Sequence, residues 1–375
     1  MKLGLLILFL LSIRPINGFS QFKIQKIAEF KIESLLAVEI LDFHPQSKLY
    51  LGYINNPDGT EVALINEYGE IMVRKVLVGQ GPNQSSSSFN SMAFSENGDI
   101  WIQTPFQILL YDQKLNLKKN TKYLSGTKTY SFGKMEVFPF FHLKYPLGFS
   151  FFTTPTGVDR SVDGRDFNNK NLLEIFTPDE SKLFEIAPIS DRLLYKNLDK
   201  SIWALYFPVF TLDRIKKKLY LTTTLDNEIT VYDLITKKLE SRIIIKHGEF
   251  KSIKGAITQN SLPSYKNLIT LGAKNSKIFF LDGGLLVLDY IREIPSLTYE
   301  KKIVEDPTYH HFKDPNYHRL IIFDNTKQLT GDLPLPPNAK VMMSLPENCL
   351  LAQLINKDVE EDFIRYGVFK LMETK

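Results

Sequence analysis

The chain has 375 residues and a single cysteine, Cys349. One thiol cannot form an internal disulfide, so the hydrophobic core has to hold the fold by itself. Hydrophobic residues make up 43% and aromatic residues 12% of the chain, which is enough for a large core and excludes a disordered protein. Cys349 lies in the apolar segment NCLLAQLI, where we expect a small buried hydrophobe rather than a nucleophile.

Familiar catalytic patterns are missing as well. The sequence has no GxSxG, HExxH, CxxC, GxGxxG or GxxxxGKS/T motif. It therefore gives no sign of a nucleophile elbow, a zinc protease helix, a redox dithiol or a nucleotide-binding loop, and no cofactor is predicted. Paired carboxylates for glycoside chemistry cannot be chosen from 42 acidic residues without their geometry. The sequence leaves open whether the protein is an enzyme.

Neither sign of charge is in large excess. Lys and Arg number 46 against 42 Asp and Glu, a net charge of +4. Without the first twenty residues, which include Lys2 and Arg14, 44 basic side chains face 42 acidic ones and the net charge is +2. This balance gives no global attraction to nucleic acid or to an anionic membrane, so we predict neither as a partner.

Long hydrophobic runs are absent except near the N-terminus, where the apolar run Leu3–Ile13 follows Lys2. Its length suits the hydrophobic region of a signal peptide and is too short to span a bilayer. Small residues just before Gln21 favour cleavage at this position. No cysteine lies near the cleavage site, which argues against a lipoprotein, and an uncleaved membrane anchor is the alternative. We predict a signal peptide at 1–20 and a periplasmic or secreted mature chain at 21–375 with no transmembrane segment.

No stretch sustains the 3.6-residue spacing of an amphipathic helix, so no helices are predicted. Short alternating segments separated by turns occur instead. Lys218–Glu240 alternates apolar and polar residues and turns at Asp226-Asn227 and Asp233, a pattern typical of three antiparallel strands. Asn97-Gly98 between apolar runs is a strong hairpin signal and carries Trp101 to the core face, between blades.

Weaker copies of this strand pattern recur along the chain. An acidic or amide residue closes the third strand of each copy, with an average spacing of about 50 residues that is typical of four-stranded blades. These residues are Asn66, Asp112, Asp179, Asp233, Asp289 and Asp324. The pattern predicts an all-β fold, a single-domain six-bladed β-propeller of four-stranded antiparallel blades, with five or seven blades as alternatives. Phe22–Ile32 would be the strand that closes the last blade.

Three phrases resemble a known group of proteins. Gly79–Gln84, Asn97–Trp101 and Tyr317–Arg319 are similar to phrases in secreted bacterial six-bladed propellers of unknown function, a group akin to NHL-type propellers. The resemblance covers the mature chain and implies a propeller fold and export, but no activity. The acidic residue that usually follows the glycine-proline phrase is missing here, so no role of that acid is carried over.

The spacing D-x-S-x-D-G at Asp159–Gly164, followed by Asp166, is similar to the start of a calcium loop. Oxygen ligands at alternate positions with a glycine bend suit Ca²⁺ coordination. Position twelve is Lys170 where the loop needs a glutamate, so a solvated hairpin extension is the alternative. The candidate metal ligands are Asp159, Asp163 and Asp166.

Three of the six histidines fall in the segment DPTYHHFKDPNYH, at residues 306–318. Imidazole and carboxylate groups together can bind a metal or transfer protons, but the spacing matches no zinc signature and a polar loop between blades is the alternative. Tyr317 and Arg319 share one face of the strand that follows. If that face lines the central channel, Tyr317, His318 and Arg319 would suit an anionic or sugar ligand; otherwise Arg319 ties blades together through backbone carbonyls.

The phrase Gly79–Gln84 has two interpretations. Its glycines allow a turn with exposed amide groups that would bind an anion as a nest, whereas the alternative is a plain crossover loop between blades.

We expect a monomeric binding or scaffolding module that recognises a protein or an extracellular polymer, such as a polysaccharide, through its loops and central channel. The alternative is a metal-assisted hydrolase or lyase with its site on the propeller axis. Such an enzyme needs several carboxylates and amides that converge on the axis.

Overall fold

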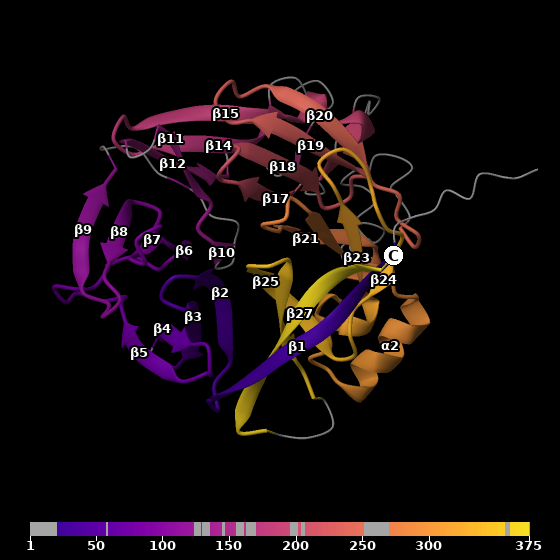
Figure 1. Ribbon diagram of the computed structural model, residues 1–375, viewed down its shortest axis with the longest axis horizontal. Coiled ribbons are helices and arrows are strands. Elements are labelled where there is room, and N and C mark those ends of the chain that lie inside the picture. Colours follow the sequence, from indigo (N-terminus) through magenta and orange to yellow (C-terminus); the bar gives the residue numbers. More distant parts are fainter. Residues whose placement is uncertain are drawn as a thin grey trace, which may run out of the picture.

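The computed structural model describes residues 21–57, 59–123, 129, 136–144, 147–154, 161–162, 170–195, 202–203, 207–250, 270–356 and 361–374. Six antiparallel sheets stand in a ring around a central axis, and each sheet is one blade of a β-propeller (Figure 1). The predicted all-β class and the count of six blades are confirmed.

Within each blade the strands follow one another from the axis outward. The first strands of neighbouring blades lie against each other, as β17 does against β21 and β2 against β6 and β25, so the first strands line the axis. The first blade consists of β2 (Val38–His44), β3 (Leu49–Asn56), β4 (Gly59–Asn66) and β5 (Ile71–Val76), and the second of β6 (Ser91–Phe94), β7 (Ile100–Gln103), β8 (Gln107–Tyr111) and β9 (Leu117–Lys122). The third blade consists of β11 (Phe140–Lys144), β12 (Leu147–Thr153), β14 (Asn171–Thr177) and β15 (Lys182–Pro188), and the fourth of β17 (Pro208–Asp213), β18 (Lys218–Thr223), β19 (Glu228–Asp233) and β20 (Leu239–Ile244). The fifth blade consists of β21 (Lys274–Phe280), β22 (Leu286–Ile291), β23 (His318–Phe323) and β24 (Leu333–Pro334), and the sixth of β25 (Ala339–Leu345), β26 (Cys349–Leu354), β27 (Phe363–Thr374) and β1 (Gln21–Glu33).

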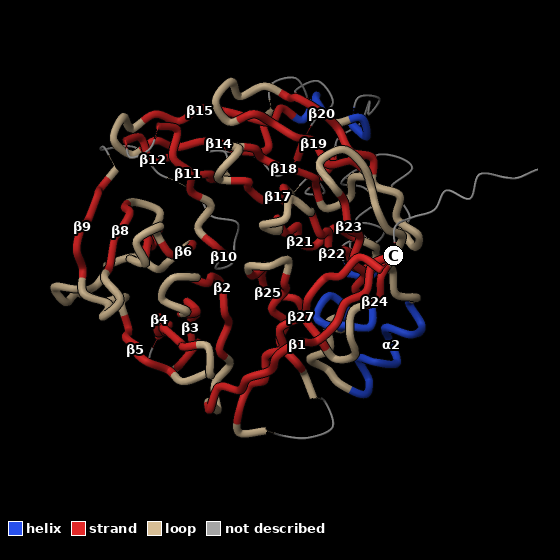
Figure 2. The backbone as a smooth tube through the Cα atoms, in the orientation of Figure 1, coloured by secondary structure: helices blue, strands red, loops and turns tan. Residues whose placement is uncertain are grey.

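The second blade has an additional strand on its axis side. β10 (Glu136–Val137) pairs in parallel with β6 and also lies against β2. Figure 2 shows this segment inside the ring, near its centre. A separate two-stranded sheet joins β13 (Ser161–Val162) to β16 (Ile202–Trp203).

The first described strand, β1, closes the ring, as predicted. β1 pairs in antiparallel fashion with β27, so the sixth blade takes its outermost strand from the N-terminal end and its other three from the C-terminal end (Figure 1). Phe30 on β1 stacks on Tyr50 of the first blade at 5.1 Å and on Tyr366 of β27 at 5.5 Å. These rings join the last blade to the first.

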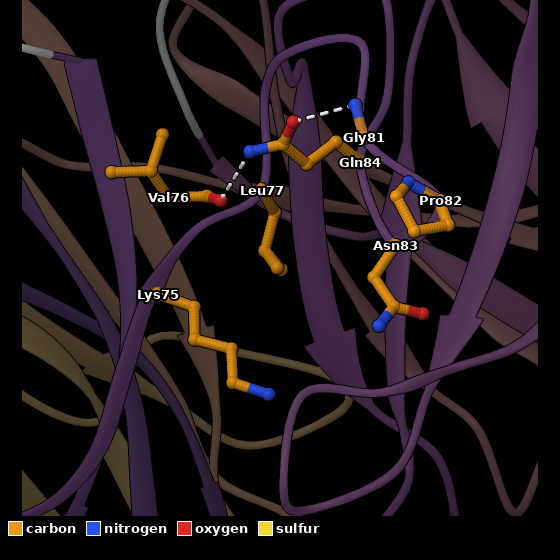
Figure 3. Close-up of a pocket in the computed structure, with 7 residues that line it drawn as sticks. All are labelled: Lys75, Val76, Leu77, Gly81, Pro82, Asn83 and Gln84. Carbon is orange, nitrogen blue, oxygen red and sulfur yellow. Dashed lines mark hydrogen bonds between the residues drawn. The ribbon is translucent and has the colours of Figure 1, made fainter.

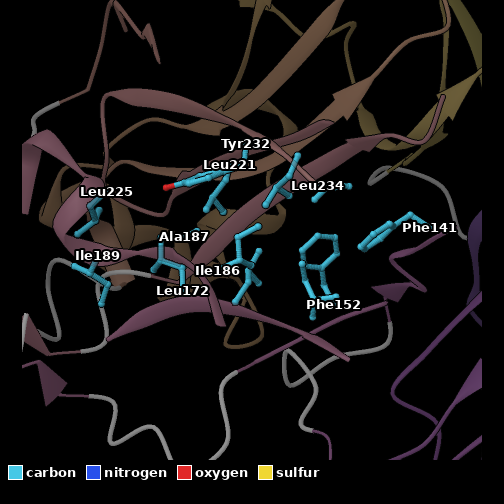
Figure 4. Packing of buried hydrophobic residues seen from close by; sticks show 13 residues of the cluster. Phe141, Phe152, Leu172, Ile186, Ala187, Ile189, Leu221, Leu225, Tyr232 and Leu234 are labelled. Atoms are coloured by element: carbon cyan, nitrogen blue, oxygen red, sulfur yellow. The ribbon is translucent and has the colours of Figure 1, made fainter. Parts of the chain in front are cut away.

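The hydrophobic core lies between blades, where the alternating apolar side chains of one sheet meet those of the next. Figure 4 shows the cluster between the third and fourth blades, which includes Phe141, Phe152, Leu172, Ile186, Leu221 and Tyr232. Trp101 is half-buried between the second and third blades and stacks on Phe149 at 4.8 Å. Cys349 is a buried free thiol, as expected.

The direction of the strands gives the two faces of the ring different loops. In every four-stranded blade, the turn between the second and third strands opens on the same face as the crossover to the next blade. We call this the crossover face. The turns between the first and second strands and between the third and fourth strands open on the opposite face.

The prediction of no helices is wrong. The connection between β22 and β23 contains α2 (Ser296–Glu305), which lies at the rim of the ring (Figure 1). None of its residues is buried. Because an exposed helix does not need a continuous apolar stripe, its sequence lacks the periodic signal on which the prediction depended.

The predicted register of the last two blades is also wrong. Asp289 does not close a third strand but lies inside β22, the second strand of the fifth blade. Asp324 follows β23 and closes the third strand of that same blade. The connection between β22 and β23, residues 292–317, separates Asp289 from Asp324 by a distance along the chain that resembles the spacing between blades.

Candidate binding site on the fifth blade

The connection from β22 to β23, residues 292–317, carries most of the predicted histidine segment. It contains α2 and two short 3-10 turns, η5 (His311–Lys313) and η6 (Pro315–Tyr317), and it lies on the crossover face. The turns return the chain to β23 because Asp314 caps η6 by accepting from the Asn316 amide at 3.2 Å. This brings the predicted residues Tyr317, His318 and Arg319 together at one end of the blade.

His318 forms a buried ion pair with Asp289 on the neighbouring strand. Its Nδ1 lies 2.8 and 2.9 Å from the two carboxylate oxygens, and its Nε2 lies 3.0 Å from the carbonyl oxygen of Phe312. Burial opposes the charge, but the carboxylate outweighs it and raises the pKa of His318. Because both nitrogens act as donors in the charged ring, neither is left for a ligand.

Arg319 and Tyr317 do not reach the axis, because β23 is the third strand of its blade. The guanidinium of Arg319 donates to the carbonyl oxygens of Asn316 at 3.0 Å and His318 at 2.7 Å. These carbonyls belong to its own loop, so Arg319 fixes the end of the connection rather than tying blades together. The ring of Tyr317 lies under the guanidinium of Arg292 at 5.3 Å.

His311 is the most deeply buried histidine of the segment. Its ring makes edge contacts with Tyr317 at 5.9 Å and Tyr299 at 6.5 Å. Burial, together with the charges of Lys274 and His318, lowers the pKa of His311 to about 4. The ring is therefore neutral at physiological pH.

Lys274 is the basic residue that the sequence analysis missed at this site. It begins β21, the innermost strand, and its ammonium lies 4.9 Å from the ring centre of Phe312. Burial lowers the pKa of Lys274 to about 8, so the amine can exchange a proton near neutral pH. No pattern could have identified it, because Lys274 lies far from the histidines in the sequence.

A second carboxylate holds the connection in place. Asp314 is buried and accepts from the hydroxyl of Tyr309 at 3.0 Å and from the ammonium of Lys302 on α2 at 3.2 Å. The ion pair and hydrogen bond fix α2 and the histidine segment relative to each other. The ammonium of Lys274, the neutral imidazole of His311 and the exposed ring of Phe312 thus lie close together on the crossover face.

The candidate calcium ligands Asp159, Asp163 and Asp166 lie outside the residues that the structure describes. Among the described residues, no group of three or more histidine, cysteine, aspartate and glutamate side chains is arranged to hold a metal ion. In the histidine segment, His310 is exposed and stacks on Phe312, whereas His311 is buried among aromatic rings and His318 is buried against Asp289.

The glycine-proline phrase is a crossover loop with its amide groups already engaged. The Gly79 amide donates to Ser85 O at 2.8 Å, and the Gly81 amide donates to Oε1 of Gln84 at 2.8 Å. Gln84 in turn donates from Nε2 to Val76 O at 3.2 Å (Figure 3). These two amides therefore do not form the anion-binding nest that was one interpretation of the phrase.

Comparison with known proteins shows similarity in fold. The chain superposes on a member of the DUF4221 family from Bacteroides vulgatus with a TM-score of 0.72 and 12% sequence identity, over 95% of this chain and 100% of the other. It also superposes on a candidate exported protein from Bacteroides fragilis with a TM-score of 0.52 and 9% identity, over 94% and 96% of the two chains. The chain shares the fold of bacterial propellers.

The expected resemblance to six-bladed bacterial propellers of unknown function is thus confirmed at the level of fold. No protein-family model and no curated protein matches the chain. In the part of the chain that the structure describes, no helix is both long and apolar enough to cross a membrane.

Proposed function

We propose that this protein is an exported binding module that recognises a protein partner through its crossover face. The sequence predicts either a protein or an extracellular polymer as the partner, and this proposal selects the protein. The metal-assisted hydrolase or lyase is not proposed, because no observation on the described residues favours it.

The distribution of exposed apolar side chains supports this proposal. Fifteen large hydrophobic side chains are exposed among the described residues. Eight lie on connections of the crossover face, three lie on turns of the opposite face and four lie within strands. The eight are Leu35, Leu36, Phe106, Leu193, Phe207, Leu297, Val304 and Phe312.

The helix α2 adds to this face. Leu297 is 81% and Val304 84% exposed, and the seven-residue spacing places them on one side of the helix, two turns apart. Exposed aliphatic and phenylalanine side chains gain free energy when another protein covers them, about 25 cal/mol per Å². A polysaccharide is instead recognised through polar groups and aromatic platforms, so the aliphatic residues favour a protein.

The experiment compares the two faces in two steps. A photo-reactive amino acid at Phe207 or Phe312, and in a matched protein at Ile215 or Ile235 on the opposite face, is activated in the producing cell. The protein captured from the crossover face is identified and purified, and its Kd is then measured. The variant with Phe106, Phe207 and Phe312 changed to Ser should bind at least about tenfold more weakly, a loss of about 1.4 kcal/mol.

The matched control is the variant with Tyr68, Ile215 and Ile235 changed to Ser, which should bind like the wild type. Equal weakening by both variants, or adducts from both faces alike, contradicts the proposal. Adducts that consist only of carbohydrate would assign the face to a polymer instead.

Export is tested separately. The closing strand β1 begins at Gln21, so cleavage before this residue leaves the strand complete. Mass spectrometry of the protein recovered outside the cytoplasm should show an N-terminus at Gln21. An intact Met1 in protein from the same fraction contradicts cleavage.

A further inference from the structure

A shallow pocket of about 410 Å³ lies at the outer junction of the first and second blades, away from the candidate site on the fifth blade. It is lined by Lys75 and Val76 at the end of β5, by Leu77 and by the loop residues Gly81, Pro82, Asn83 and Gln84 (Figure 3). Its volume falls within the range of about 300–1,000 Å³ found for small-molecule sites.

The wall of the pocket is built by Gln84. Its carboxamide accepts from Gly81 N and donates to Val76 O, so it ties the loop to the end of β5. A Cβ at Gly79 would lie 2.3 Å from Oε1 of Gln84, and one at Gly81 would lie 2.8 Å from it. The two glycines are therefore required for this side chain to lie flat against the loop.

Two polar side chains converge on the pocket because both are attached to the turn between β8 and β9. The ammonium of Lys75 donates to Oδ1 of Asn116 at 3.3 Å and to Leu115 O at 3.4 Å, and Oδ1 of Asn83 accepts from the Leu117 amide at 3.3 Å. The hydroxyl of Tyr111 donates to Asn83 O at 3.1 Å and fixes the loop. Because Oδ1 of Asn83 accepts from the Leu117 amide, Nδ2 of the same side chain lies on the side where Lys75 ends (Figure 3).

We infer that this pocket binds a carboxylated sugar unit, such as a uronic acid of an acidic polysaccharide. The carboxylate lies between the ammonium of Lys75 and Nδ2 of Asn83, which supply charge and a hydrogen-bond donor. The pyranose ring lies against the carbon atoms of Pro82, which is exposed. The pocket lies on the crossover loop from β5 to β6, and none of the eight exposed apolar side chains of the proposed protein-binding surface lines it, so the inference does not depend on that proposal.

A peptide that binds by adding a strand needs a free sheet edge. The edge of the chain that follows β5 is already paired at the pocket. Ser85 donates from its amide to Leu77 O at 2.7 Å and accepts from the Gly79 amide, so the loop itself covers this edge.

Isothermal titration calorimetry with digalacturonic acid tests the inference on the mature protein. We expect a Kd in the millimolar range, about 1–10 mM. Lys75→Met and Asn83→Ala should each weaken binding at least about fivefold, since each removes a hydrogen bond to the charged carboxylate. Arg74→Met removes the same charge from the neighbouring residue of β5, which points to the other face of the sheet, and should leave the Kd unchanged within about twofold.

Two further ligands serve as controls. Cellobiose, a neutral disaccharide, and a blocked glutamate dipeptide should both bind at least about tenfold more weakly than digalacturonic acid. The inference is overturned if digalacturonic acid does not bind at up to about 50 mM, if either control ligand binds equally well, or if both pocket variants retain wild-type affinity. Tryptophan fluorescence and urea unfolding of each variant verify that it is folded.

Discussion

Arg192 donates from Nε to Oδ2 of Asp226 over 2.6 Å, and neither side chain has any exposed surface. Arg192 lies on the crossover from the third to the fourth blade, and Asp226 lies in the turn between β18 and β19. Nη1 also donates to Leu221 O at 3.0 Å and to Oγ1 of Thr230 at 2.6 Å, while Nη2 donates to Glu228 O at 2.6 Å. The guanidinium thus fixes the crossover to the fourth blade.

Replacing this arginine should strongly destabilise the protein. Arg192→Met leaves the carboxylate of Asp226 buried without its cation, which costs about 3–5 kcal/mol. Urea unfolding followed by circular dichroism measures the loss. Arg74→Met is the control, because Arg74 is exposed and lies 3.8 Å from Glu61, and we expect a change below about 1 kcal/mol. Equal effects of the two variants contradict the structural role of Arg192.

The buried neutral histidine predicts lower stability in acid. The pKa of His311 is about 4 in the folded protein and about 6.5 in the unfolded chain. Between these values the unfolded chain binds more protons, so the free energy of unfolding falls as the pH falls from about 6.5 to about 4. In His311→Phe this fall should be smaller, as measured by urea unfolding at several pH values. His310→Phe, at an exposed position, should behave like the wild type.

The ion pair of His318 with Asp289 predicts that the free energy of unfolding falls as the pH rises above about 6.5. Its raised pKa means that the folded protein binds more protons than the unfolded chain above about pH 6.5. This contribution is complete below about pH 6.5 and is lost as the pH rises through the folded pKa. His318→Gln should remove this loss, and NMR titration of the ring should show a pKa above 6.5. A decline that persists in the variant would exclude His318 as its source.

Trp101→Ala should cost about 2–3 kcal/mol, less than the 3–5 kcal/mol of a fully buried tryptophan. The side chain is half-buried, but its stacking on Phe149 joins the second blade to the third. Trp101→Phe should recover part of the loss. Thermal unfolding measures both variants, and a loss below about 1 kcal/mol for the alanine variant would show that the ring contributes little to the contact between blades.

Deleting residues 22–32 should abolish cooperative unfolding, because β27 then loses the partner that closes the ring. Differential scanning calorimetry should show no sharp transition. Ile27→Ser is the control: Ile27 is exposed at the point where the register of β1 and β27 shifts, and its change should be within about 0.5 kcal/mol. An unchanged melting temperature of the deletion variant falsifies closure by β1.

The sequence by itself determined the strands, their turns, the number of blades and the closing strand. Alternation of apolar and polar residues and turn pairs such as Asn97-Gly98 are local signals, and local signals specify where strands begin and end. The crossover loop, one of the two interpretations of the glycine-proline phrase, is also confirmed, because glycine permits a turn and proline fixes φ at their own positions.

Only the tertiary structure decided which blade the strands near the C-terminal end join. Asp289 and Asp324 each carry the acidic signal expected at the end of a third strand, but both lie in the sheet of the fifth blade. It also decided which side chains meet. Lys274 lies near His311, Arg192 binds Asp226, and Lys75 donates to Asn116 because the ring brings these segments together. Such contacts depend on how blades pack against each other, and no spacing along the chain encodes that packing.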